Sequence, residues 1–186
     1  MRSTNLTNQF LIAMPSLADP NFSQTVTYIC AHNDDGAMGI VINRQLDIPL
    51  GEVFKQLDLE AENEDIETLP VYLGGPVQAD RGFVLHNSDT EWQSSAHISN
   101  DIGIATSRDI LEAIAHGKGP RESLIALGYA GWGAGQLEEE IKSNAWLSGP
   151  ADIEVIFRTP CEERWNAAAK LLGVNIDTLS SDIGHA

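Results

Sequence analysis

The sequence contains 186 residues, with 27 Asp and Glu against 11 Lys and Arg, and its formal net charge at pH 7 is −16. This negative field repels phosphate backbones and the chain has no basic run, so direct nucleic-acid binding is disfavoured. The apolar fraction of 42% is enough for a sizeable core, which excludes a wholly disordered chain and fits one domain over residues 1–186.

The N-terminal half contains short segments rich in β-branched and aromatic residues, which predict strands. The predicted strands cover residues 9–13, 25–31, 39–43, 71–73 and 81–86. An apolar stripe at helical spacing follows Pro49 and predicts a helix over residues 50–57. The acidic stretch 58–67 has no clear period, so we expect a solvent-exposed loop there.

The C-terminal half alternates further strands with three better-marked helices. Strands are predicted at residues 98–105, 124–129 and 153–157, and helices at residues 107–116, 136–142 and 159–173. The last helix has the clearest start, because Thr159 and Glu162 match a capping box and Pro160 suits the first turn. In the helix 136–142, the acidic residues 138–140 are expected to face solvent largely.

The order of these elements favours an α+β fold with a mixed sheet over a doubly wound fold, because strands and helices do not alternate in regular βαβ units. Several predicted strands, such as the one that begins Gly39-Ile-Val-Ile, are apolar throughout rather than alternating. Strands of that kind are covered on both faces, so we expect about four helices packed on the sheet.

No segment predicts export or membrane insertion. The apolar run at residues 10–14 is shorter than the roughly 7 to 15 residues of a signal-peptide core, and no run approaches the roughly 18 residues of a membrane span. Cys30 and Cys161 form neither a CxxC pair nor a disulfide framework, and Cys30 is expected to be buried in a strand. We therefore expect a cytoplasmic protein with no membrane contact.

A glycine run over residues 128–135, with Gln136 after it, joins a predicted strand to a predicted helix. Main-chain amides at such a junction can hold an anion. The candidate ligand-binding residues here are Gly131, Gly133, Gly135 and Gln136. No lysine follows as in a P-loop, and Gln136 replaces the third glycine of a dinucleotide fingerprint. The alternative is structural, with glycines that let Trp132 pack closely at a sharp turn.

A second candidate combines a Gly-Gly-Pro corner at residues 74–76 with an Asp and Arg pair at residues 80–81. Such a pair beside a rigid turn can grip a polar ligand. The candidate ligand-binding residues here are Gly74, Gly75, Asp80 and Arg81. More often a pair of this kind fixes a loop, and the Gly-Gly-Pro corner has backbone requirements of its own.

Nothing in the sequence identifies a catalytic site. Five polar residues end two predicted strands but match no known metal spacing: His32, Asp34, Asp35, His86 and Asp89. Ser94 and Ser95 lie near His97 in the chain, but the G-x-S-x-G elbow of hydrolases is missing. We therefore predict no catalytic residues, no metal ligands and no cofactor, and we favour a non-enzymatic protein.

Many linked motifs resemble the YqgE/AlgH family, and they extend over nearly the whole chain. They include Phe-Leu-Ile-Ala-Met-Pro at 10–15, Gly-Ala-Met-Gly-Ile-Val-Ile-Asn-Arg at 36–44, Asp-Arg-Gly-Phe-Val-Leu-His at 80–86, Leu-Gly-Tyr-Ala-Gly-Trp at 127–132 and the closing Gly-His-Ala at 184–186. The sequence departs from the family at Gln45, where members often have proline after the arginine. That difference affects local turn geometry.

The resemblance implies a bacterial α+β protein whose bifurcated sheet forms a pseudo-barrel. Members are commonly labelled transcriptional regulators, and the family has no established catalytic residues. The charge of −16 and the absence of a helix-turn-helix pattern indicate that any such regulation is indirect. We therefore expect a regulatory or accessory protein that acts through an unidentified protein partner. The alternative is a small-molecule-binding protein or an unrecognised enzyme with its site at residues 128–136.

Overall fold

The structure, a computed structural model, describes residues 5–88 and 92–176. In this part of the chain ten strands form two sheets joined by one long strand, β9 (Ser123–Gly133). One sheet contains β10 (Trp146–Pro150), β1 (Gln9–Ala13), β2 (Val26–Asn33), β3 (Gly36–Val41) and the end of β9, all antiparallel. The other contains β4 (Gln45–Pro49), β5 (Pro70–Leu73), the start of β9, β6 (Val77–Asn87), β8 (Ile102–Ala105) and β7 (Ser95–His97).

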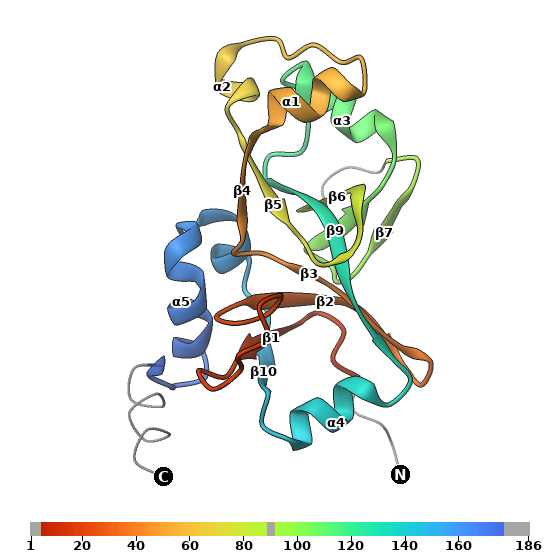
Figure 1. Ribbon diagram of the computed structural model, residues 1–186. Coiled ribbons are helices and arrows are strands. Elements are labelled where there is room, and N and C mark those ends of the chain that lie inside the picture. The colour runs from red at the N-terminus through yellow and green to blue at the C-terminus, as the bar shows by residue number, and fades with distance from the viewer. Residues whose placement is uncertain (1–4, 89–91, 177–186) are drawn as a thin grey trace.

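Strand β9 passes from one sheet to the other at Gly128, and Figure 1 shows it crossing the middle of the molecule. Its first half pairs with β5 in parallel and with β6 antiparallel, and its second half pairs with β3. Gly128 has a φ of +79°, a conformation that glycine adopts without a steric penalty. The change of direction at this glycine divides the sheet and curls it.

The chain after β5 packs directly against this bend. The N–H of Gly74 donates to the carbonyl of Leu127 at 2.8 Å, and the carbonyl of Gly74 accepts from the N–H of Val41 at 2.8 Å. A Cβ added to Gly75 would lie 2.1 Å from the carbonyl carbon of Tyr129. Glycine at positions 74 and 75 therefore lets three strands meet within main-chain contact distance.

Helices cover both ends and one side of the curled sheet (Figure 1). Helices α1 (Leu50–Gln56), α2 (Glu64–Glu67) and α3 (Arg108–Ala115) close the upper end, and α4 (Gln136–Lys142) lies at the lower end. Helix α5 (Arg164–Lys170) packs on the side, after a π-helical turn at Glu154–Arg158 and a 3₁₀ turn at Cys161–Glu163. No helix among the described residues has the length and apolar character needed to span a membrane.

Three groups of buried apolar side chains hold these layers together. The largest lies between the curled sheet and α5, and includes Phe10, Tyr28 and Ile156. A second lies between the sheet and helices α1 and α3. A third, which includes Trp132 and Trp146, lies between the sheet and α4. Because burying one such side chain contributes about 1.5–3 kcal/mol, each group fixes its helix firmly on the sheet.

The predicted fold class is confirmed: the protein is α+β, with a bifurcated mixed sheet curled into a half-barrel under packed helices. The strands predicted at 9–13, 25–31, 39–43, 71–73, 81–86 and 124–129 form the centres of observed strands, and helices occur within 50–57, 107–116, 136–142 and 159–173. The structure adds β4, β7 and β10, which the apolar patterns did not reveal.

Four local predictions were wrong. Residues 154–157 belong to the π-helical turn, which follows Ile153 and in which the Asp152 side chain accepts from the N–H of Glu154. A strand was predicted there because a short apolar run does not distinguish strand from helix. The segment 98–105 becomes strand only from Ile102. The predicted loop 58–67 contains α2, which begins where the Asn63 side chain accepts from the N–H of Ile66. The capping box is absent, since the Thr159 hydroxyl donates back to the carbonyl of Glu154.

Candidate functional site

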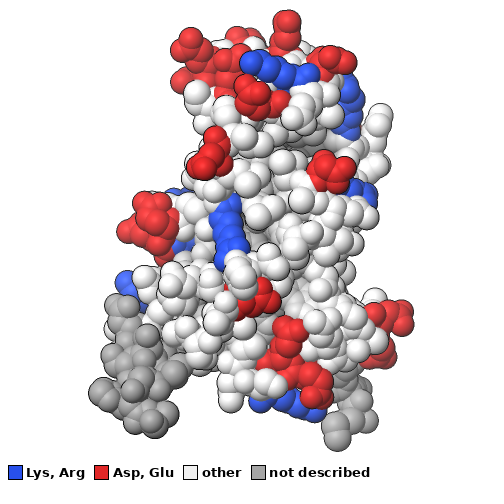
Figure 2. Space-filling view, in the orientation of Figure 1, with Lys and Arg blue, Asp and Glu red and all other residues white. Residues whose placement is uncertain are grey.

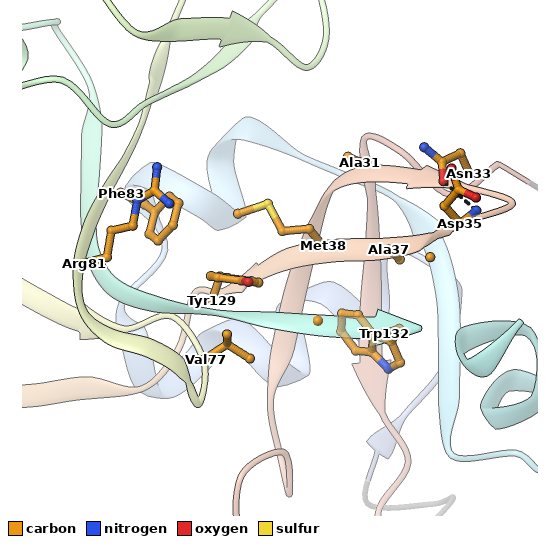
Figure 3. Close-up of a pocket in the computed structure, with 12 residues that line it drawn as sticks. Ala31, Asn33, Asp35, Ala37, Met38, Val77, Arg81, Phe83, Tyr129 and Trp132 are labelled. Atoms are coloured by element: carbon orange, nitrogen blue, oxygen red, sulfur yellow. Dashed lines mark hydrogen bonds between the residues drawn. The ribbon is translucent and has the colours of Figure 1, made fainter. Parts of the chain in front are cut away.

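An open groove lies beside the bend of β9, with a volume of about 720 Å³. Its floor comes from β2, β3 and the second half of β9, and one wall comes from the start of β6. Figure 3 shows this arrangement. The groove therefore lies where the two sheets separate, next to the contacts of Gly74 and Gly75 with β9.

The floor of the groove is mostly uncharged and contains small residues. Ala31, Ala37 and Gly131 line it, so a ligand's main chain could approach the strands closely. Tyr129 and Phe83 meet edge to face, with their ring centres 5.7 Å apart. Aromatic side chains in such a position offer a large contact area at low cost in conformational entropy.

The two ends of the groove carry opposite charges. In Figure 3, Arg81 and Phe83 lie at one end, and Asn33 and Asp35 lie at the other, with Met38 between them. The Arg81 guanidinium lies 5.3 Å from the centre of the Phe83 ring and donates to the Gln78 side chain at 3.3 Å. Within the described part of the chain, no carboxylate lies within the 4.0 Å of an ion pair with Arg81. Its charge therefore remains available to an anionic group of a ligand.

A smaller and more enclosed pocket, of about 290 Å³, lies on the other side of Arg81 beneath α1 and α3. Its walls include Val53, Leu111 and Ile125, and Asp80, Arg81 and Arg108 also line it. Arg108 is already paired with Glu112 at 2.9 Å. Its volume admits only a compact ligand, and it shares Arg81 with the groove.

The structure separates the predicted site residues into three groups. Arg81 and Gly131 line the groove, and Asp80 and Arg81 line the smaller pocket. Gly74 and Gly75 contact the main chain of β9 so closely that they serve as packing positions. Thus the segments 74–82 and 128–136 lie side by side, and residues of both line one groove.

The third group, Gly133, Gly135 and Gln136, makes the turn into α4. The N–H of Gly133 donates to the Gln136 side chain at 2.9 Å, and Gly135 precedes the helix with a φ of +76°. Gln136 also donates to Glu140 at 2.9 Å. With this amide satisfied and three glutamates following, the turn is a poor cradle for an anion.

Sequence reasoning missed Met38, Phe83 and Tyr129, and it considered Asp35 only as one of five polar residues at strand ends. Phe83 and Tyr129 lie on strands that were predicted, and Met38 lies one residue before a predicted strand, but which face of a strand lines a groove depends on the strand register. The motif 80–86 contains Phe83 and the glycine run 128–135 contains Tyr129. The prediction selected the glycine and charged residues of these segments and left out the aromatic residues beside them.

The histidines near the ends of β2 and β6 have separate partners. Because His32 Nδ1 accepts from the N–H of Leu6 at 3.0 Å, its Nε2 carries the proton and donates to Glu138 at 3.1 Å. His86 Nδ1 bonds the carbonyl of Asn87 at 2.7 Å. Across residues 5–88 and 92–176, no three His, Cys, Asp or Glu side chains gather as a metal site, and Asp89 lies outside the described residues.

Cys30 and Cys161 are free thiols, and burial raises the pKa of both above its ordinary value. For Cys161 the neighbouring Arg164 opposes this shift. Since the thiolate is the reactive form, we expect an alkylating reagent to leave Cys30 unmodified in the folded protein and to modify both cysteines in denaturant. Mass spectrometry of the adducts checks this, and rapid labelling of Cys30 without denaturant would contradict its burial.

The sequence profile of the family described as AlgH-like matches residues 10–177. The chain belongs to the AlgH-like family. A UPF0301 protein of Thioalkalivibrio sulfidiphilus is 57% identical over 184 residues, which are 99% of this chain and 98% of that protein. A UPF0301 protein of Hahella chejuensis is 58% identical over 183 residues, which are 98% of this chain and 97% of that one.

Solved structures agree with this AlgH-like assignment. The solution structure of AlgH from Pseudomonas aeruginosa matches with a TM-score of 0.81 and 52% identity, over 97% of this chain and 95% of that chain. A protein from Corynebacterium diphtheriae matches with a TM-score of 0.75 at 17% identity, over 97% of this chain and 94% of that chain. The second likeness shows the fold alone. The names of these relatives state no activity.

Proposed function

We propose that this AlgH-like chain is a non-enzymatic regulatory or accessory protein of the cytoplasm that acts through a protein partner. An extended segment of that partner would occupy the groove between β3, β6 and β9. The observation that carries this proposal is the uncharged floor between Arg81 and Asp35. It suits a segment with an acidic residue, an apolar stretch and a basic residue, in that order along the groove.

The distribution of charge supports a protein partner over a nucleic acid. On the face that Figure 2 shows, acidic side chains gather at the top, over α1 and α2, and again around α4. The affinity of a duplex would depend on Lys and Arg contacts, which a chain of net charge −16 supplies poorly. If the protein regulates transcription, we propose that it does so indirectly.

A small-molecule-binding function is the second candidate, and the enclosed pocket beneath α1 and α3 favours it. There Asp80, Arg81 and Arg108 surround an apolar interior, so a compact polar ligand could be held by the sequence-predicted Asp80 and Arg81. A thermal-shift screen of metabolites distinguishes this candidate, because a ligand of the pocket stabilises the purified protein without any partner.

Replacement of Arg81 by glutamate is expected to abolish partner binding. The change places a negative charge where the partner's acidic residue should lie, and the loss of a charge pair of this kind costs about 2 kcal/mol or more. The measurement uses a photo-crosslinking amino acid at position 37, in the groove, in protein expressed in its native bacterium. The chain with the wild-type Arg81 should form a discrete protein adduct, and the Arg81→Glu chain should not.

Lys170→Glu is the matched control, since it makes the same change of charge at an exposed position of α5. It should leave the adduct unchanged. Equal adducts from Arg81→Glu and wild type, or adducts at position 37 no stronger than at a position on α5, would count against the proposed function. Salt-sensitive retention of duplex DNA by the purified protein would replace it with direct DNA binding.

A further inference from the structure

Arg164 is the one Lys, Arg, Asp or Glu that is buried among the described residues, with 5% of its surface exposed. It stands at the start of α5, where that helix packs on the side of the curled sheet. In a chain with 27 acidic residues, a buried arginine is expected to form an ion pair with a carboxylate. Arg164 instead donates to two main-chain carbonyls.

The hydrogen bonds of Arg164 go to neutral acceptors. Its Nε donates to the carbonyl of Thr159 at 2.9 Å, and its Nη1 donates to the carbonyl of Ile42. Across the described ranges, no carboxylate lies within the 4.0 Å of an ion pair with it. A guanidinium has five N–H groups, so these two hydrogen bonds use only part of its donors. A buried charge without a counter-charge also costs free energy.

A pocket of about 280 Å³ opens beside this guanidinium, between β5, the start of β9 and the π-helical turn. Its apolar walls include Leu124, Ile156 and Phe157, and Tyr72 and Arg164 also line it. The guanidinium carbon lies 5.0 Å from the centre of the Tyr72 ring. Thus one cation and one phenol sit in a pocket that has apolar walls on one side and also contains the polar Ser123.

The other titratable groups around the pocket do not compensate the positive charge of Arg164. Burial raises the pKa of Tyr72, so its phenol is neutral and can donate a hydrogen bond at pH 7. Burial also raises the pKa of the Cys161 thiol. Glu162 lies nearby but is exposed, where water screens its charge.

We propose that this pocket binds a small monocarboxylate with an apolar body, a ligand distinct from the partner segment of the groove. The carboxylate is held by Arg164, and the apolar body packs against Leu124, Ile156 and Phe157. One buried cation compensates one negative charge, and the field of a chain with net charge −16 opposes ligands of higher charge. A pocket of this volume also limits the ligand to a compact molecule.

Titration of the ¹⁵N-labelled full chain with sodium hexanoate, followed by NMR, tests the proposal. Saturable shifts are expected at the residues that line the pocket, with hexanol binding at least about tenfold more weakly because it lacks the charge-assisted hydrogen bond. Inorganic phosphate should produce no shifts there. Equal responses to hexanoate and hexanol, binding of phosphate, or hexanoate shifts confined to the groove or to the pocket beneath α1 and α3 would overturn it.

Two variants and a control locate the carboxylate. Arg164→Gln should weaken hexanoate binding by about tenfold or more, and Tyr72→Phe, which removes only the hydroxyl, by a few-fold. Arg108→Gln, which changes an exposed arginine of the other pocket, should leave the affinity unchanged. If Arg164→Gln does not fold, Tyr72→Phe and the comparison of hexanoate with hexanol decide the matter. Unchanged affinity in the folded Arg164→Gln or in Tyr72→Phe would refute the assignment.

Discussion

Replacing Gly75 by alanine is expected to lower the free energy of unfolding by about 3 to 5 kcal/mol, a loss in the range of severe single substitutions. The added Cβ would lie 2.1 Å from the carbonyl carbon of Tyr129 and 2.3 Å from the nitrogen of Ala130. These are main-chain atoms of β9, paired with β3 at Ala130, so they cannot turn aside as a flexible side chain would. Urea denaturation followed by circular dichroism gives the measurement.

Gly82→Ala is the matched control for this substitution. Gly82 lies in β6 of the same sheet, and an added Cβ would meet nothing within 4 Å. It should change stability by no more than about 1 kcal/mol, with stabilisation the expected direction because alanine restricts the unfolded chain. Equal losses from both substitutions would show that the close approach of Gly75 to β9 does not hold the bifurcation together.

The sequence predicted the centres of most strands because local apolar patterns carry that information. The division of β9 between two sheets is a long-range property: it depends on Gly128 meeting the chain at Gly74 and Gly75, which lie more than fifty residues away. From the residues alone we obtained only a mixed α+β sheet. The bifurcated pseudo-barrel came from the resemblance to a family.

The candidate site was predictable to a similar degree. Arg81 and Gly131 were named from their motifs, because unusual combinations of glycine and charge are visible locally. Tyr129 and Phe83 were missed, because their shared edge contact exists only once the register of β6 against β9 is set. The buried Arg164 was missed too, since no local pattern places an arginine in a core.

The acidic run of α4 shows the same limit. We predicted that residues 138–140 largely face solvent, and for Glu139 this is correct. Glu138 instead accepts a hydrogen bond from His32, and Glu140 is half-buried against two tryptophans. The amphipathic pattern placed Leu137 inward correctly but could not reveal acceptors for indole groups that lie on other strands.

Replacing Glu140 by alanine is expected to lower the free energy of unfolding by about 2 to 4 kcal/mol, because it leaves buried donors without partners. One oxygen of Glu140 accepts from Trp132 Nε1 at 3.1 Å and from Trp146 Nε1 at 3.0 Å, and the other accepts from Gln136 at 2.9 Å. Only 6% of Trp132 and 3% of Trp146 are exposed, so water does not readily replace the carboxylate. Denaturant unfolding followed by tryptophan fluorescence measures the loss.

Glu139→Ala removes the same charge and the same number of atoms from the neighbouring position of α4. The Glu139 side chain is 76% exposed, and its contact with Lys142 at 3.7 Å is a surface ion pair, so its loss should change stability by no more than about 0.5 kcal/mol. The native fluorescence spectrum should also shift in Glu140→Ala and not in Glu139→Ala. If both variants unfold at the same denaturant concentration, α4 is held on the sheet by Leu137 and its apolar neighbours alone, and the carboxylate adds nothing measurable.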